Sequence, residues 1–258
     1  MSKDEELRAF DDYREFEGNQ SACQKILVIC LNRLRVFYRS PFQWFIFVIP
    51  TLYVVIQLFI VYAIVASLTE GKGTNKIITI MFTFYFTLFL VLGQLLTASV
   101  FGFAPMQERK EGLRQMMHMS GLSSIQYYAG LFLGDLFLFS CSGVVLSLAL
   151  IPFPQIMVGS QIFNFFISYV FFGAALINMC YILAHIFSEA ETGQKYLGVL
   201  ILVGFLVGPI VLSLIFAAIL GFEHSISGAL SVWYYIDPVV AFILTLYNQC
   251  CIGKPDLD

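Results

Sequence analysis

The residues of this chain that could do chemistry are few and widely separated. The three histidines, His118, His185 and His224, lie in different parts of the sequence. The six cysteines show neither the spacing of a zinc site nor that of a disulfide framework. The sequence also has no glycine-rich phosphate-binding loop and no nucleophile elbow. We therefore predict no catalytic site, no metal site and no cofactor bound by this chain.

One carboxylate, Asp135, stands inside a long apolar segment, in the sequence Gly134-Asp135-Leu136. A charged side chain in the centre of a membrane span costs about 2.5–3.5 kcal/mol on insertion scales unless it is paired or hydrated. We therefore expect Asp135 to face the interior of a helix bundle. Hydroxyl or amide groups of other spans, or Arg and Lys at helix ends, are its expected partners. A structural polar anchor is the favoured role, and a proton or substrate site is the alternative.

The surrounding sequence has the composition of a membrane protein. Hydrophobic residues make up 59% of the 258 residues and charged residues 12%, whereas soluble domains carry about 25% charged residues. The expected fold is an all-α membrane protein, a polytopic bundle with five spans. A transmembrane helix needs about 20 apolar residues, and suitable runs lie at about 42–68, 77–103, 127–151, 162–187 and 197–220.

Two polar segments precede the first span. Residues 1–20 are rich in Asp and Glu, which predicts a solvated acidic tail on the cytosolic side. Residues 21–41 have the pattern of an amphipathic helix, with a capping box at Ser21 and Gln24. Lys25, Arg33 and Arg35 are assigned to its polar side, so we expect the helix to lie in the headgroup layer. A solvated helix packed on another domain is the alternative.

Basic residues predict the topology. They cluster between Lys25 and Arg39, before the first span, and between Arg109 and Arg114, after the second. The loop after the third span carries no charge. By the positive-inside rule the N-terminus lies in the cytosol. We expect a multi-pass integral membrane protein whose partners include membrane lipids but no nucleic acid.

The C-terminal region lacks a complete sixth span. The apolar run from Val239 to Ile252 has about 14 residues, which is too short to cross a bilayer. We expect a re-entrant hairpin over about 222–252, with Asp237 and Pro238 forming its turn, and a short tail over 253–258. An incomplete sixth span is the alternative.

The segment between the second and third spans carries the strongest functional signal. Pro105 is expected to end the second helix, and residues 106–120 then have the pattern of a short amphipathic helix parallel to the membrane. Its apolar edge consists of Leu113, Met116 and Met117, and Glu108, Arg109, Lys110 and Glu111 provide its charges. Such a helix can transmit force from a soluble partner. A plain interfacial helix without a partner is the alternative.

A family resemblance rests on this segment. The sequence reads Gln107-Glu108-Arg109-Lys110-Glu111-Gly112-Leu113-Arg114-Gln115-Met116-Met117-His118-Met119-Ser120-Gly121-Leu122, followed by Tyr127-Tyr128 and Asp135. It resembles the first intracellular helix of ABC transporters of the A subfamily. The resemblance implies the transmembrane half of an ATP-driven lipid exporter or flippase. Residues 106–120 would be its coupling helix, resting on a nucleotide-binding domain that supplies ATP and Mg²⁺ outside this chain. A second transmembrane half would complete the transporter.

The chain differs from many A-subfamily members in its short loop between the first two spans, within Thr69 to Ile80. A sixth span and a nucleotide-binding domain, both expected from the resemblance, are not among these 258 residues. A fragment, a truncated gene product and one piece of a split transporter all remain open. Alternative functions are a half-transporter similar to the G subfamily, a passive channel or scramblase, and a structural membrane partner protein.

Overall fold

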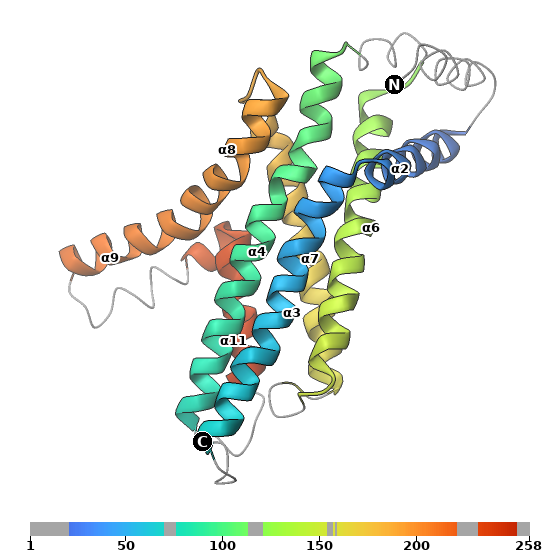
Figure 1. The fold of residues 1–258 in the computed structure, drawn as a ribbon. Helices are drawn as coiled ribbons and strands as arrows, with labels where there is room; N and C mark the ends of the chain where they lie inside the picture. Colours follow the sequence, from blue (N-terminus) through green and yellow to red (C-terminus); the bar gives the residue numbers. More distant parts are fainter. Residues whose placement is uncertain are drawn as a thin grey trace.

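The computed structural model describes residues 21–69, 76–112, 121–153, 157, 159–220 and 232–251, and all regular elements of this part are helical. The helices are α2 (Ala22–Arg39), α3 (Pro41–Thr69), α4 (Lys76–Lys110), α6 (Ser124–Leu150), α7 (Gly159–Ala184), α8 (Ala190–Leu202), the π-helical turn η2 (Val203–Val207), α9 (Gly208–Leu220) and α11 (Pro238–Cys251) (Figure 1). Among the described residues, five helices are long and apolar enough to cross a membrane, with α8, η2 and α9 forming the fifth. The predicted fold class is confirmed.

Helix α4 forms the centre of the bundle. It packs against α3, α7, α8 and α11. Its Phe101 ring is fully buried and lies 6.1 Å from the ring of Phe47 on α3 and 6.0 Å from that of Phe139 on α6. The helices that surround α4 expose many large apolar side chains on their outer faces, as expected of a protein surrounded by membrane lipid.

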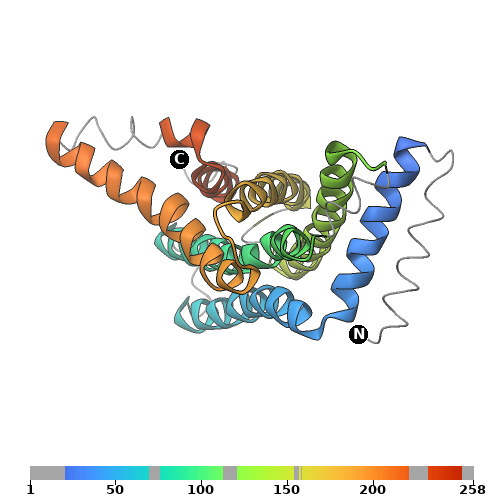
Figure 2. The same ribbon diagram turned by 90° about the horizontal axis from the view of Figure 1, so that it is seen from above.

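Helix α2 lies across one end of the bundle, beside α6 (Figure 2). The predicted capping box is confirmed, because the Ser21 hydroxyl accepts a hydrogen bond from the Gln24 backbone and the Gln24 side chain accepts one from the Ser21 backbone. Only Ser40 separates α2 from α3. The C-termini of α4 and α7 and the N-terminus of α6 meet at this end of the molecule, which we call the α2 end (Figure 1).

The expected end of the second span at Pro105 is wrong. Helix α4 continues through Pro105 to Lys110, so residues 106–110 form its last turns rather than the start of a separate helix. A proline removes one backbone donor, and packing against neighbouring helices offsets this loss in a membrane bundle. Met106, directly after the proline, is 1% exposed. The helix instead ends near Gly112, whose φ of 71° lies in the left-handed region that favours glycine.

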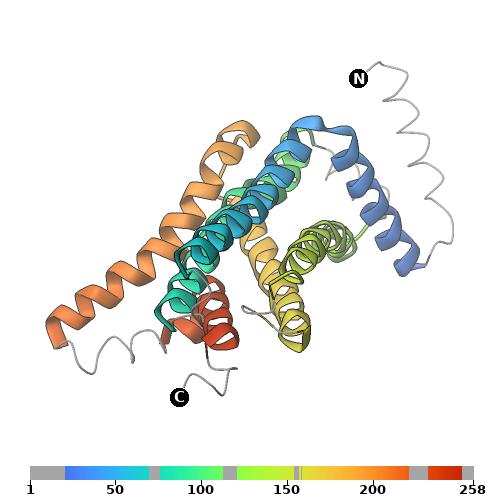
Figure 3. The same cartoon turned by 60° about the horizontal axis from the view of Figure 1, so that its bottom comes forward.

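The fifth span is longer and less regular than expected. It begins at Ala190, and the π-helical turn interrupts it at Val203–Val207. The sequence explains this turn, because Pro209 has no N–H and cannot form the α-helical hydrogen bond to the carbonyl four positions earlier. The N–H of the preceding residue, Gly208, bonds to the Val203 carbonyl five positions earlier, which is the π-helical pattern. Helix α9 then extends away from the other helices (Figures 1 and 3).

Asp237 and Pro238, the predicted turn of a hairpin, lie between two helical segments. Residues 232–236 form one helical turn, and α11 begins at Pro238. The Asp237 carboxylate accepts hydrogen bonds from the backbone N–H groups of Val239 (2.8 Å) and Val240 (3.3 Å), so it caps α11. The rest of the predicted hairpin, residues 222–231 and 252, lies outside the described residues, so the hairpin stays a prediction.

Candidate functional site

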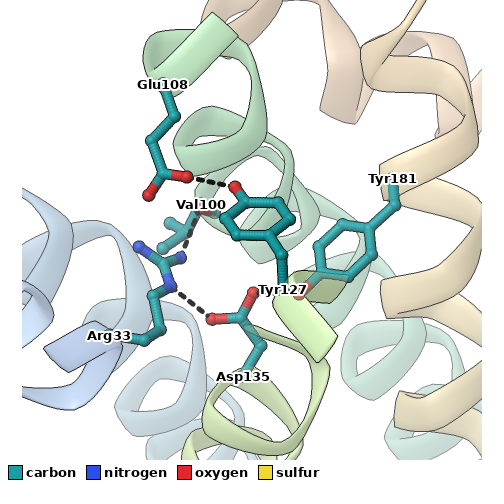
Figure 4. A network of polar contacts seen from close by, with 6 residues as sticks. All are labelled: Arg33, Val100, Glu108, Tyr127, Asp135 and Tyr181. Carbon is teal, nitrogen blue, oxygen red and sulfur yellow. Dashed lines mark hydrogen bonds and ion pairs between the residues drawn. The ribbon is translucent and has the colours of Figure 1, made fainter. Parts of the chain in front are cut away.

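Asp135 is the centre of a buried polar network at the α2 end (Figure 4). It projects from α6 and is fully buried. Its Oδ1 accepts a hydrogen bond from Arg33 Nε on α2 at 2.7 Å, and its Oδ2 accepts one from the Tyr181 hydroxyl on α7 at 2.7 Å. Arg33 Nη2 also donates to the Val100 carbonyl of α4 at 3.3 Å. Four helices therefore meet at one carboxylate and one guanidinium.

The assignment of Arg33 to the polar face of α2 is wrong. Its side chain is 3% exposed and points into the bundle. Burial alone would lower the pKa of the Arg33 guanidinium, but the adjacent Asp135 carboxylate raises it, and the net shift is upward. The arginine therefore stays charged. Removing one partner of such a pair would leave the other charge buried and unpaired, which typically costs about 3–5 kcal/mol.

Two glycines of α6 allow α2 to come close enough for this pair to form. A Cβ on Gly130 would lie 2.7 Å from Ile29 Cβ and 2.8 Å from the Ile26 carbonyl oxygen. A Cβ on Gly134 would lie 3.1 Å from Arg33 Cβ. Small residues four positions apart create a shallow groove on a helix, into which a second helix can pack. The groove places the Arg33 side chain directly over Asp135.

A second contact joins α4 to α6. The Tyr127 hydroxyl, near the start of α6, donates a hydrogen bond to the Glu108 carboxylate in the last turn of α4 (Figure 4). The position of Tyr127 is fixed locally, because α6 begins with a capping box between Ser123 and Gln126. Tyr127 is 4% exposed, so Glu108 turns inward rather than toward a partner.

A third contact joins α4 to the end of α7. The Arg109 guanidinium donates to the carbonyl groups of Ala184 (3.3 Å), His185 (3.5 Å) and Phe187. The last carbonyls of a helix have no partner within the helix and carry partial negative charge, so a cation there caps the helix and neutralises its dipole. Arg109 thus fixes the C-terminus of α7 to the C-terminus of α4.

The structure divides the predicted coupling residues into three groups. Glu108 and Arg109 are half-buried and make the contacts within the chain described above. Lys110 and Glu111 are exposed at the tip of α4. Leu113, Met116 and Met117 lie outside the described residues, so the rest of the predicted helix at 106–120 stays a prediction.

Sequence reasoning missed three members of the network, namely Arg33, Tyr127 and Tyr181. Arg33 and Asp135 are 102 positions apart, and a helical-wheel argument cannot connect residues at that separation. Tyr181 has no feature that distinguishes it from other aromatic residues of membrane spans, and Tyr127 was noted only as part of the family motif, without a hydrogen-bond partner. The available signal was the spacing of Gly130 and Gly134 directly before Asp135, because a small-residue groove beside a buried carboxylate indicates where another helix must bring a cation.

Comparison with known proteins places the chain in a family. Residues 65–256, well over half of the chain, match the family described as ABC-2 family transporter protein. The chain belongs to this family. No curated protein matches it. Membership in the ABC-2 transporter family identifies the chain as a transmembrane component of an ABC transporter and implies that it works with a nucleotide-binding domain.

The contacts at the α2 end form one connected set. The tip of α4 is bonded to α6 through Glu108 and to α7 through Arg109. The Arg33–Asp135 pair joins α2 to α6, and the Tyr181 hydroxyl that donates to Asp135 joins α7 to the same carboxylate. A force applied at the tip of α4 would therefore reach α2, α6 and α7 as well.

Proposed function

We propose that this chain is one transmembrane half of an ATP-driven transporter similar to the A subfamily, and that it moves lipids or other hydrophobic substrates. The family supports the transporter, and the resemblance around Glu108 to Asp135 supports the subfamily. In this proposal a nucleotide-binding domain and a second transmembrane half complete the transporter. The distribution of Lys and Arg supports a cytosolic side for the N-terminus and the α2 end.

The observation that carries the proposal is the bonding of the last turn of α4. Glu108 and Arg109 hold this turn against α6 and α7, while Lys110 and Glu111 remain exposed beyond them. Residues 113–120, the rest of the coupling helix predicted at 106–120, follow Gly112 in the sequence. Closure of the ATPase domains would press on this segment, and the bonded helix ends would carry the movement into the bundle.

This division of roles changes which residues should contact the partner. Glu108 and Arg109 act within the chain, so their substitution would disturb the bundle as well as the interface. Lys110 and Glu111 are the described residues that can meet a nucleotide-binding domain without loss of an inter-helix contact. Reversing both charges, with Lys110→Glu and Glu111→Lys, should weaken electrostatic complementarity at the interface and leave the bundle intact.

The test is ATP-dependent lipid movement by the purified complex in proteoliposomes. The wild-type complex should move a fluorescent phospholipid between leaflets only while ATP is hydrolysed, and the double charge reversal should lower transport and substrate-stimulated hydrolysis together. A complex with a hydrolysis-deficient ATPase domain is the control. Lipid movement that continues in this control would show a passive scramblase. No movement of any hydrophobic substrate, with no ATPase bound, would favour a structural membrane protein.

A further inference from the structure

Helix α2 has two faces with different surroundings. One face packs on α6 and holds Arg33 and Phe37 in the interior. The opposite face is apolar and exposed, with Leu27 at 58%, Leu31 at 53% and Tyr38 at 76% of their surfaces accessible. Since Ser40 alone separates α2 from the first span, this face lies at the membrane boundary. An apolar helix face at that depth is covered by the lipids of its own leaflet.

The contact of Tyr38 with Trp44 supports this placement. Their rings lie 6.3 Å apart, and Trp44 belongs to the first turn of α3. Trp and Tyr concentrate at the boundary between headgroups and acyl chains, because their rings are amphipathic.

The inner face of α2 is held against the bundle by close backbone contact and by a buried ion pair, and sliding of α2 along α6 would break both. Gly130 and Gly134 bring the backbones of α2 and α6 into contact. Arg33 then reaches α6 at Asp135 and α4 at Val100. If α2 moved away from α6, the Asp135 carboxylate would be left without its counter-charge inside the membrane, so the two helices must move together or stay together.

We propose that Arg33 is a positioning residue that makes α2 part of the moving unit formed by α4, α6 and α7, so that α2 shifts within the lipids of its leaflet during each ATP cycle. This inference rests on the proposed function, because it requires an ATP-driven movement of α4. It extends that function by assigning α2 a lipid-contacting surface coupled to the ATPase cycle. The opposite arrangement is an α2 that stays fixed in the leaflet while the spans move against it.

The experiment places an environment-sensitive fluorophore at position 38, in a variant without other reactive cysteines, and measures its emission in the reconstituted complex with and without trapped nucleotide. Arg33→Gln removes the charge that holds α2. The matched control is Arg35→Gln, which removes an exposed arginine from the same helix. Transport per ATP hydrolysed is measured on the same samples.

In the wild type and in Arg35→Gln, emission should change when nucleotide is trapped. In Arg33→Gln this change should disappear, and transport per ATP should fall by about fivefold or more, while Arg33→Lys restores part of both. If Arg33→Gln does not accumulate, Tyr181→Phe removes one hydrogen bond from Asp135 and keeps the ion pair, and it should lower both signals partially. Signals in the accumulating variants equal to those of the wild type would overturn the inference.

A failure of the proposed function would look different. In that case the wild-type complex would show no ATP-dependent transport. If transport is present in the wild type but position 38 reports no change with nucleotide, the transporter account stands and the mobile α2 is wrong.

Discussion

The packing of α2 into the glycine groove of α6 predicts that Gly130→Ala destabilises the protein. The added Cβ would lie 2.7 Å from Ile29 Cβ and 2.8 Å from the Ile26 carbonyl oxygen. Both distances are below ordinary van der Waals contact, and one of the two atoms belongs to the backbone, so a side-chain rotation cannot relieve the overlap. Helix α2 would have to move away from α6.

The size of the effect follows from two opposing contributions. Overpacking a well-packed interface costs about 1–3 kcal/mol, and the backbone contact places this site in the upper part of that range. Alanine recovers about 1 kcal/mol relative to glycine within a helix. The net loss of stability is therefore about 1–2 kcal/mol. For a chain of this size it corresponds to a decrease in Tm of roughly 2–8 °C.

The assay is thermal unfolding of the purified protein in detergent, followed by the loss of helical signal. Two controls bracket the result. Gly134→Ala places its Cβ 3.1 Å from Arg33 Cβ and 3.3 Å from the Cys30 carbonyl oxygen, so α2 would have to shift by only a few tenths of an ångström. Its destabilisation should therefore be smaller than that of Gly130→Ala and close in size to the gain in helix propensity. Gly204→Ala meets no atom within 4 Å and should be neutral or stabilising. A Gly130→Ala variant as stable as the wild type would refute the close packing of α2 on α6.

Three further predictions concern other parts of the chain. Arg109→Ala should destabilise the protein by about 2 kcal/mol, because three carbonyls at the end of α7 lose a charged donor; an unchanged Tm would contradict this capping role. Asp237→Ala should cost about 1 kcal/mol through the lost N-cap, whereas Asp237→Asn retains the acceptor and should be nearly neutral; equal stabilities of the two variants would argue against the cap. Cysteines at Lys72 or Ser160 should react with an impermeant reagent from outside the membrane, and one at Lys110 only after permeabilisation; labelling at Lys110 in intact cells would reverse the proposed topology.

Composition and hydrophobic run length were sufficient to predict the number of spans, because each membrane helix satisfies its own backbone and needs an apolar surface of fixed length. The local capping rule placed a helix start at Ser21, since that signal depends on neighbours within three residues. This position agrees with the structure.

The errors occurred where distant residues override a local signal. Pro105 normally ends a helix, but in α4 the contacts of Glu108 and Arg109 with α6 and α7 hold the following turn in helical form. Arg33 follows the pattern of an exposed basic residue, yet the fold supplies it with a buried counter-charge 102 positions away. In both cases a tertiary contact decides the outcome, and no window of the sequence contains both partners.

The central claim is that the tip of α4 receives force from a nucleotide-binding domain. The most direct measurement is photo-crosslinking from an unnatural amino acid at position 110 of the assembled complex, with position 160, at the start of α7 and the opposite end of the bundle, as the control. The account predicts an adduct between position 110 and the nucleotide-binding domain whose yield changes when nucleotide is trapped, and no such adduct from position 160. No adduct from position 110, or equal yields from both positions, would contradict it.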